Sequence, residues 1–109
     1  MKNEKPIRVQ IFRPKGELSL EDSIEMKKIF NAYLVEGLVH VVINMGKISH
    51  IHLAGLPIFL EQKKKFKSYG GEIKLCDVSP YLQHIMDLAD VKRFFNIYDT
   101  EEQASDSFS

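Results

Sequence analysis

Apolar residues change their spacing along the chain, and the changes mark out alternating strands and helices. Residues 7–11 alternate between apolar and polar side chains, which is typical of a strand with one solvated face. Residues 38–45 are almost continuously apolar and β-branched, which favours a strand buried on both faces of a parallel sheet. Two further strands are predicted, one over residues 72–78 and a short edge strand over residues 94–98.

Helical spacing and helix-start signals fill the intervals between these strands. Most of the starts carry a serine or threonine that can cap the first turn, and two have a proline within it. The expected helices begin near Leu20, Leu53, Pro80 and Glu101. Strands that alternate with helices in this way form a mainly parallel sheet with helices packed on it. We therefore predict an α/β fold, a mixed and mainly parallel sheet of four to five strands flanked by about four helices.

Length and composition set the class of protein. The 109 residues fit one domain, with a core over about residues 7–104 and a frayed tail over residues 105–109. Fifteen basic residues balance 15 acidic ones, so the chain lacks the basic face of a nucleic-acid-binding protein. Cys76 is the single cysteine, so no internal disulfide can form, which suits a reducing compartment. Residues 1–10 lack the apolar core of a secretory signal, and no apolar stretch is long enough to cross a bilayer. We expect a cytoplasmic protein without direct membrane insertion, which is either a monomer or part of a larger complex.

The chain shows no catalytic, cofactor-binding or metal-binding motif. A Ser/His/Asp set, a glycine-rich phosphate loop and cysteine pairs with metal spacing are all absent, so we expect neither enzymatic activity nor a cofactor. His50 and His52 point the same way in an extended segment, but two ligands do not complete a metal site. We expect these imidazoles to lie at the surface or against a partner.

Several other residues have structural interpretations. The run of lysines at positions 63–67 predicts a solvated helix face. Cys76, Tyr81 and Tyr98 fit the apolar faces and are predicted to belong to the core. Residues 46–52 are predicted to be a loop that leads from the buried strand into the second helix. Free backbone N–H groups at that helix terminus favour an anion, and this end of a parallel sheet is where α/β proteins place functional loops.

Six short motifs, in this order and at this spacing, resemble the STAS domain of bacterial anti-sigma factor antagonists over about residues 7–104. They are Gly16-Glu17-Leu18, Val41-Val42-Ile43-Asn44, Ile48 to Leu56, Gly70-Gly71-Glu72, Ser79-Pro80 and Thr100 to Ala104. The resemblance implies the STAS fold and a regulator that binds an anti-sigma factor, which is a serine kinase. In that family the kinase phosphorylates the serine that follows an aspartate in the loop before the second helix.

The chain departs from the family at that loop. The family's aspartate falls on His52 and its acceptor serine on Leu53, and the acidic position after Gly-Glu-Leu falls on Ser19. Leu53 has no hydroxyl and neither has Ala54, so phosphate transfer at the family position is excluded. Ser49 is the nearest hydroxyl, and it is the candidate for a substitute acceptor.

We therefore predict a protein-binding regulator that has lost the usual serine phosphoswitch, either a constitutive antagonist or a signalling scaffold. The alternatives are a regulatory STAS subunit of a membrane transporter and a module that senses a nucleotide or another small molecule. Leu53 is expected either to be partly exposed as a contact or to fold back onto the core. The predicted partner-binding residues are Ser49, His50, His52, Leu53, Ala54 and Gly55.

Overall fold

The apolar segment around Val42 forms an interior strand of a parallel sheet, as its composition predicts. The structure is a computed structural model that describes residues 7–108. The strands of the main sheet, in spatial order, are β1 (Val9–Phe12), β3 (His40–Asn44), β5 (Glu72–Cys76) and β6 (Ile97–Tyr98). Every pairing between them is parallel. The prediction of a mainly parallel α/β fold is confirmed.

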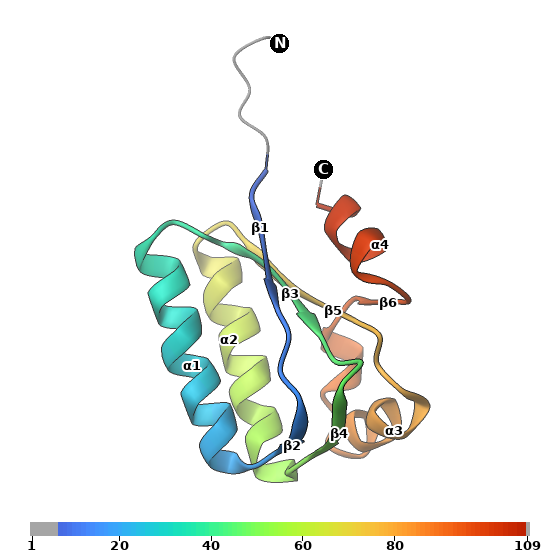
Figure 1. Cartoon of the computed structure of the whole chain (residues 1–109). Helices are drawn as coiled ribbons and strands as arrows, with labels where there is room; N and C mark the ends of the chain where they lie inside the picture. The colour runs from blue at the N-terminus through green and yellow to red at the C-terminus, as the bar shows by residue number, and fades with distance from the viewer. Residues whose placement is uncertain (1–6, 109) are drawn as a thin grey trace, which may run out of the picture.

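A second, two-stranded sheet extends the first. The strands β2 (Gly16–Leu18) and β4 (Ile48–Ile51) pair in parallel, and they follow β1 and β3 along the chain (Figure 1). The prediction of a loop over residues 46–52 is therefore wrong for β4. Its two isoleucines are buried, and its backbone is paired to a segment some thirty residues earlier, a partner that the local pattern cannot reveal.

The helices begin where the sequence predicts. Ser19 caps the first helix through a reciprocal capping box with Asp22, and Ser79 and Thr100 each accept a hydrogen bond from the third helical residue. Around Leu53 the chain first makes one 3-10 turn, and the α-helix starts three residues later. The helical elements are α1 (Leu20–Val35), η1 (Leu53–Gly55), α2 (Leu56–Ser68), α3 (Pro80–Leu88), η2 (Lys92–Phe94) and α4 (Glu101–Asp106).

The main sheet carries a different helical layer on each face. Helices α1 and α2 lie side by side over one face, and the short α4 lies over the other (Figure 1). Alternate residues of β3 therefore enter different clusters. Val41 and Ile43 join the large core with α1 and α2, whereas Val42 packs with Cys76 and Ala104 beneath α4. Cys76 is a core residue, as predicted.

The lysine run of α2 is only partly solvated. Lys63 Nζ lies 2.6 Å from Glu72 Oε1, and the Lys63 side chain is 12% exposed. Lys65 Nζ donates to Asn31 Oδ1 of α1 at 2.8 Å. The other two lysines of the run are exposed. The prediction of a solvated face is wrong for Lys63 and Lys65, because neighbouring elements supply oxygen partners for their ammonium groups.

Polar contacts hold the carboxyl end of the chain against the sheet. The sequence predicts a frayed tail over residues 105–109, whereas α4 continues to Asp106. The buried Lys74 of β5 donates to the Ser107 carbonyl at 3.2 Å and to its hydroxyl at 2.7 Å. Its ammonium also lies 4.1 Å from the ring centroid of Phe108. Ser109 lies outside the described residues.

Candidate functional site

The family's acceptor position lies on a short turn fixed to the strand beside it. His52 N–H donates to the Leu18 carbonyl of β2 at 2.9 Å, which ties the turn to the two-stranded sheet. Gly55 N–H then donates to the His52 carbonyl at 2.9 Å, and Leu56 N–H donates to the Leu53 carbonyl. The turn that presents Leu53 is therefore held at both ends by backbone hydrogen bonds.

The His52 side chain caps this turn. Its Nδ1 accepts a hydrogen bond from the Ala54 N–H at 3.2 Å, so the imidazole does what a serine or aspartate oxygen does at most helix starts. The sequence places His52 at the family's aspartate position, but it does not indicate this capping contact.

Leu53 is exposed at the tip of the turn. Its exposed fraction is 54%, and the neighbouring His52 and Ala54 are exposed as well. The expectation of at least partial exposure is met, and the alternative in which Leu53 folds back onto the core does not hold. Gly55, in contrast, is buried against α1, where a Cβ atom would lie 2.3 Å from Ser23 Oγ. Of the predicted partner-binding residues, those within residues 49–54 therefore lie at the surface, whereas Gly55 is buried beneath them.

His50 makes a contact that the sequence did not suggest. Its Nδ1 lies 2.8 Å from the Tyr81 hydroxyl of α3, and the two rings are 5.9 Å apart. Tyr81 is 52% exposed, so its assignment to the core is wrong. Tyr81, at the start of α3, therefore lies against His50 of β4. Ser49 is exposed on β4, before the turn.

The turn offers little to a metal or an anion. Among residues 7–108, no group of three histidine, cysteine or acidic side chains lies close enough to hold a metal ion. The backbone N–H groups of Ala54, Gly55 and Leu56 already have acceptors, and Pro57 has no N–H. The anion-binding terminus predicted from position therefore has three of its donors occupied by acceptors within the chain.

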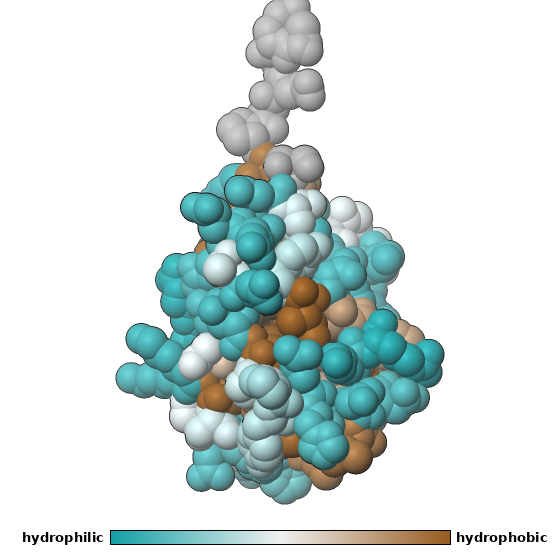
Figure 2. Space-filling view, turned by 90° about the vertical axis from the view of Figure 1, so that its right-hand side faces the viewer, coloured by the Kyte–Doolittle hydropathy of each residue, from teal (hydrophilic) through white to brown (hydrophobic). Residues whose placement is uncertain are grey.

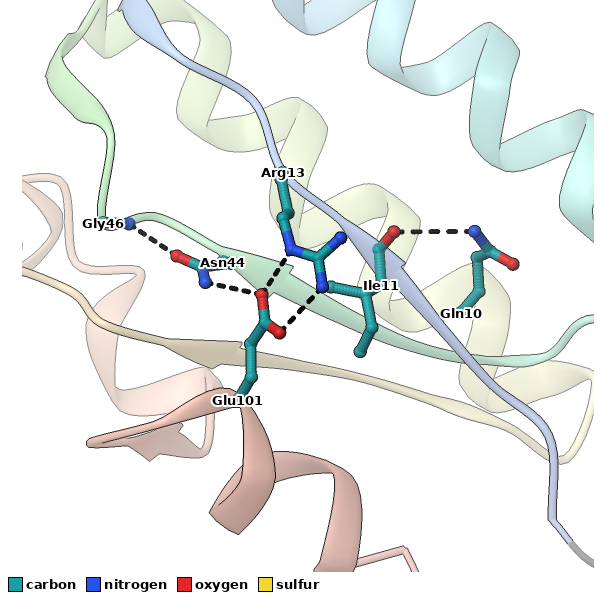
Figure 3. Close-up of polar contacts among 6 residues, drawn as sticks. All are labelled: Gln10, Ile11, Arg13, Asn44, Gly46 and Glu101. Carbon is teal, nitrogen blue, oxygen red and sulfur yellow. Dashed lines mark hydrogen bonds and ion pairs between the residues drawn. The ribbon is translucent and has the colours of Figure 1, made fainter.

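A second polar cluster joins the carboxyl ends of two strands to α4 (Figure 3). Arg13 makes a two-pronged contact with Glu101, with Nε 2.6 Å from Oε2 and Nη2 2.9 Å from Oε1. Asn44 Nδ2 donates to the same Oε2 at 2.6 Å, and Asn44 Oδ1 accepts from Gly46 N–H at 2.8 Å. The hydrogen bond from Arg13, followed by that from Asn44, lowers the pKa of Glu101. The cluster steadies the bend that leads from β3 into β4.

One side of the molecule is mostly hydrophilic, with local apolar patches. Figure 2 shows the side of the molecule that lies to the right in Figure 1, where apolar side chains gather near the centre within a hydrophilic surround. None of the helices formed by residues 7–108 is long and apolar enough to cross a membrane.

The comparison with protein families decides the family. The STAS domain family matches residues 1–104. The chain belongs to the STAS domain family. A relative in Paenibacillus polymyxa, an anti-sigma F factor antagonist, is 29% identical over 65 residues, which are 60% of this chain and 56% of that protein. The match therefore spans little more than half of that relative.

Solved structures of other proteins share the fold over nearly the whole chain. Protein TM1081 of Thermotoga maritima is 25% identical, with a TM-score of 0.82 over 97% of this chain and 86% of that one. The anti-sigma factor antagonist SpoIIAA in its unphosphorylated form is 18% identical, with a TM-score of 0.73 over 97% of this chain and 94% of that one. The STAS domain of a SulP transporter from Vibrio cholerae has a TM-score of 0.74 at 11% identity over 96% of this chain and 84% of that one. At such identities the last two likenesses concern the fold.

Proposed function

We propose that this STAS domain is a cytoplasmic protein-binding regulator of the anti-sigma factor antagonist type that works without a serine phosphoswitch. Its partner is an anti-sigma factor of the serine-kinase class or an equivalent signalling protein. The partner-binding residues are Ser49, His50, His52, Leu53 and Ala54, with Gly55 beneath them as support. The antagonist relatives support the class of function, and the geometry of the turn supports the surface.

One observation carries the proposal: an exposed leucine stands where the family's acceptor serine stands. A serine there could be phosphorylated and the complex released, whereas Leu53 has no hydroxyl and offers an apolar contact instead. Burying a whole leucine side chain is worth about 1.5–3 kcal/mol. Because 54% of Leu53 is exposed, burial under a partner contributes about half of that, which corresponds to an affinity gain of roughly 4- to 15-fold.

The test is the affinity of Leu53→Ser for a purified anti-sigma factor kinase from the same organism, measured by isothermal titration calorimetry. We expect binding about 4- to 15-fold weaker than that of the wild type, with the melting temperature nearly unchanged. Leu88→Ser is the matched control, because Leu88 is 70% exposed at the end of α3, outside the proposed surface. Equal loss of affinity in both variants, or a large drop in melting temperature for Leu53→Ser with affinity retained, contradicts the proposal.

Phosphorylation is tested separately by incubating the wild-type protein with the kinase and ATP and then measuring its intact mass. We expect no added phosphate. Ser49 is the informative exception, since it is exposed on β4 near the turn. Stoichiometric phosphate on Ser49, absent from Ser49→Ala, would show that the switch has moved rather than been lost.

A further inference from the structure

The cap of the Leu53 turn places a strict requirement on the protonation state of His52. A backbone N–H can only donate a hydrogen bond, so the Nδ1 atom that accepts from Ala54 must carry a lone pair. The ring is therefore the neutral tautomer with its proton on Nε2. A serine, asparagine or ionised aspartate at the same position would accept this hydrogen bond throughout the neutral pH range.

Protonation of His52 acts against the turn in two ways. It converts Nδ1 from an acceptor into a donor, which removes the cap and sets two N–H groups against each other. It also places a positive charge where η1 leads into α2, and the amino end of a helix already carries partial positive charge. Both effects favour release of the Ala54 N–H and loosening of the backbone on either side of Leu53.

His50 provides an internal contrast on the same surface. Its Nδ1 faces a hydroxyl, and the Tyr81 O–H can donate to a neutral imidazole or accept from a protonated one. The contact between β4 and α3 therefore survives in both protonation states. The contacts of the two histidines thus differ: the partner of His50 accommodates either state of the ring, whereas the partner of His52 requires an unprotonated Nδ1.

The polar and charged groups of the neighbouring elements are paired with other residues or are in register with His50. On β2, Glu17 is in register with His50 rather than with His52. At the start of α1, the Asp22 carboxylate is occupied by the N–H and the hydroxyl of Ser19. On α3, Tyr81 is occupied by His50, and the first turn of α2 contains no charged residue.

From this geometry we infer that His52 makes the partner-binding turn proton-sensitive: the neutral ring holds Leu53 in its binding position, and the protonated ring releases it. Where the family controls the loop by phosphate on a serine, this chain controls it by a proton on the preceding residue. The cap stabilises the turn while the ring is neutral, and it is lost when Nδ1 takes up a proton. The effect on partner affinity rests on the proposed function, whereas the effect on the turn does not.

The first measurement follows the free protein by NMR from pH 8 to pH 5. At pH 8 we expect the His52 ring to carry its proton on Nε2 and to leave Nδ1 bare. The protection factor of the Ala54 amide against hydrogen exchange should fall by roughly 2- to 30-fold as His52 is protonated, which is the range for loss of one helix cap. The fall should persist in His50→Gln and vanish in His52→Asn, because asparagine remains an acceptor at both pH values.

The second measurement is the ratio of partner affinities at pH 7.5 and pH 5.5 for the wild type and His52→Asn. Any titration within the partner affects both proteins equally, so we expect the wild-type ratio to exceed that of His52→Asn by roughly 2- to 30-fold. A proton on Nδ1 at pH 8, or equal protection factors in the wild type and His52→Asn at pH 5, would overturn the inference. Equal affinity ratios in the wild type and in His52→Asn would show that protonation of His52 does not affect partner binding. Failure to bind at either pH with the expected exchange behaviour refutes the proposed function and leaves the proton-sensitive turn standing.

Discussion

The close approach of Gly55 to α1 leads to a prediction that can be worked out from the structure. A Cβ atom on Gly55 would lie 2.3 Å from Ser23 Oγ and 3.1 Å from Ser23 Cβ. Gly55 has a φ of −83°, so its backbone accepts any residue and the cost of Gly55→Ala is steric alone. Overpacking of a core site costs about 1–3 kcal/mol, and a contact this short in a fully buried position belongs in that range.

Ser23 itself determines how the cost can be relieved. Its side chain is fully buried, and its hydroxyl has no hydrogen-bond partner among the described residues. Ser23→Ala removes an unpaired polar atom and improves helix propensity, so we expect that variant to gain about 0.5–1.5 kcal/mol. It also removes the 2.3 Å contact while keeping the 3.1 Å contact, which the neighbouring backbone can accommodate by a shift of a few tenths of an ångström.

The assay is a double-mutant cycle by urea denaturation of the wild type, Gly55→Ala, Ser23→Ala and the double variant. Gly55→Ala lowers the free energy of unfolding, and we expect this decrease to be about 1–2 kcal/mol smaller when residue 23 is alanine. Each kcal/mol corresponds to a shift of about 4 °C in the melting temperature. Additive effects, with a coupling energy near zero, would refute the argument that Gly55 is required by the Ser23 hydroxyl. A loss in Ser23→Ala would show that the hydroxyl has a partner.

Two further predictions concern titratable groups. A carboxylate whose pKa is lowered in the folded state stabilises the protein above its ordinary pKa, and this contribution is lost as the pH falls. The pKa of Glu101 is lowered in this way, so the stability of Glu101→Gln should decline less steeply than that of the wild type between about pH 5 and pH 3. The effect should be small and should weaken in high salt because Arg13 is exposed, and a decline as steep as in the wild type would contradict it. Burial raises the pKa of the Cys76 thiol to about 12. Iodoacetamide at pH 8 should therefore modify this thiol only in denaturant, because the thiolate is the reactive form. Rapid labelling of the folded protein would contradict this prediction.

The elements that the sequence predicted correctly are those with local causes. Helices capped by Ser19, Ser79 and Thr100 begin where the capping residues place them, since a cap acts within one turn. The interior strand follows from its own continuous run of β-branched residues. The strand β4 was missed because only its end residues are buried and because β2, its partner, is distant in sequence.

The candidate site divides in the same way. Exposure of Leu53 was one of the two outcomes that the sequence left open, and it follows from the place of Leu53 at the start of a helix beyond a sheet. The contact of His50 with Tyr81 was not predictable, because it joins residues that are 31 positions apart in the sequence. The cluster around Glu101 was missed for the same reason, since Arg13 lies 88 positions away from it.

The short helix α4 has a consequence for the order in which the chain is made. The ribosome releases β1, β3 and β5 before residues 101–108, so the face of the sheet around Val42 and Cys76 is complete before its cover exists. Until α4 is made, an apolar sheet face stays open to water and to neighbouring nascent chains, and Arg13, Asn44 and Lys74 lack the partners that residues 101–108 supply. A chain that stops before Thr100 lacks α4 and leaves this apolar face of the sheet uncovered, so premature termination should yield aggregates more readily than monomers.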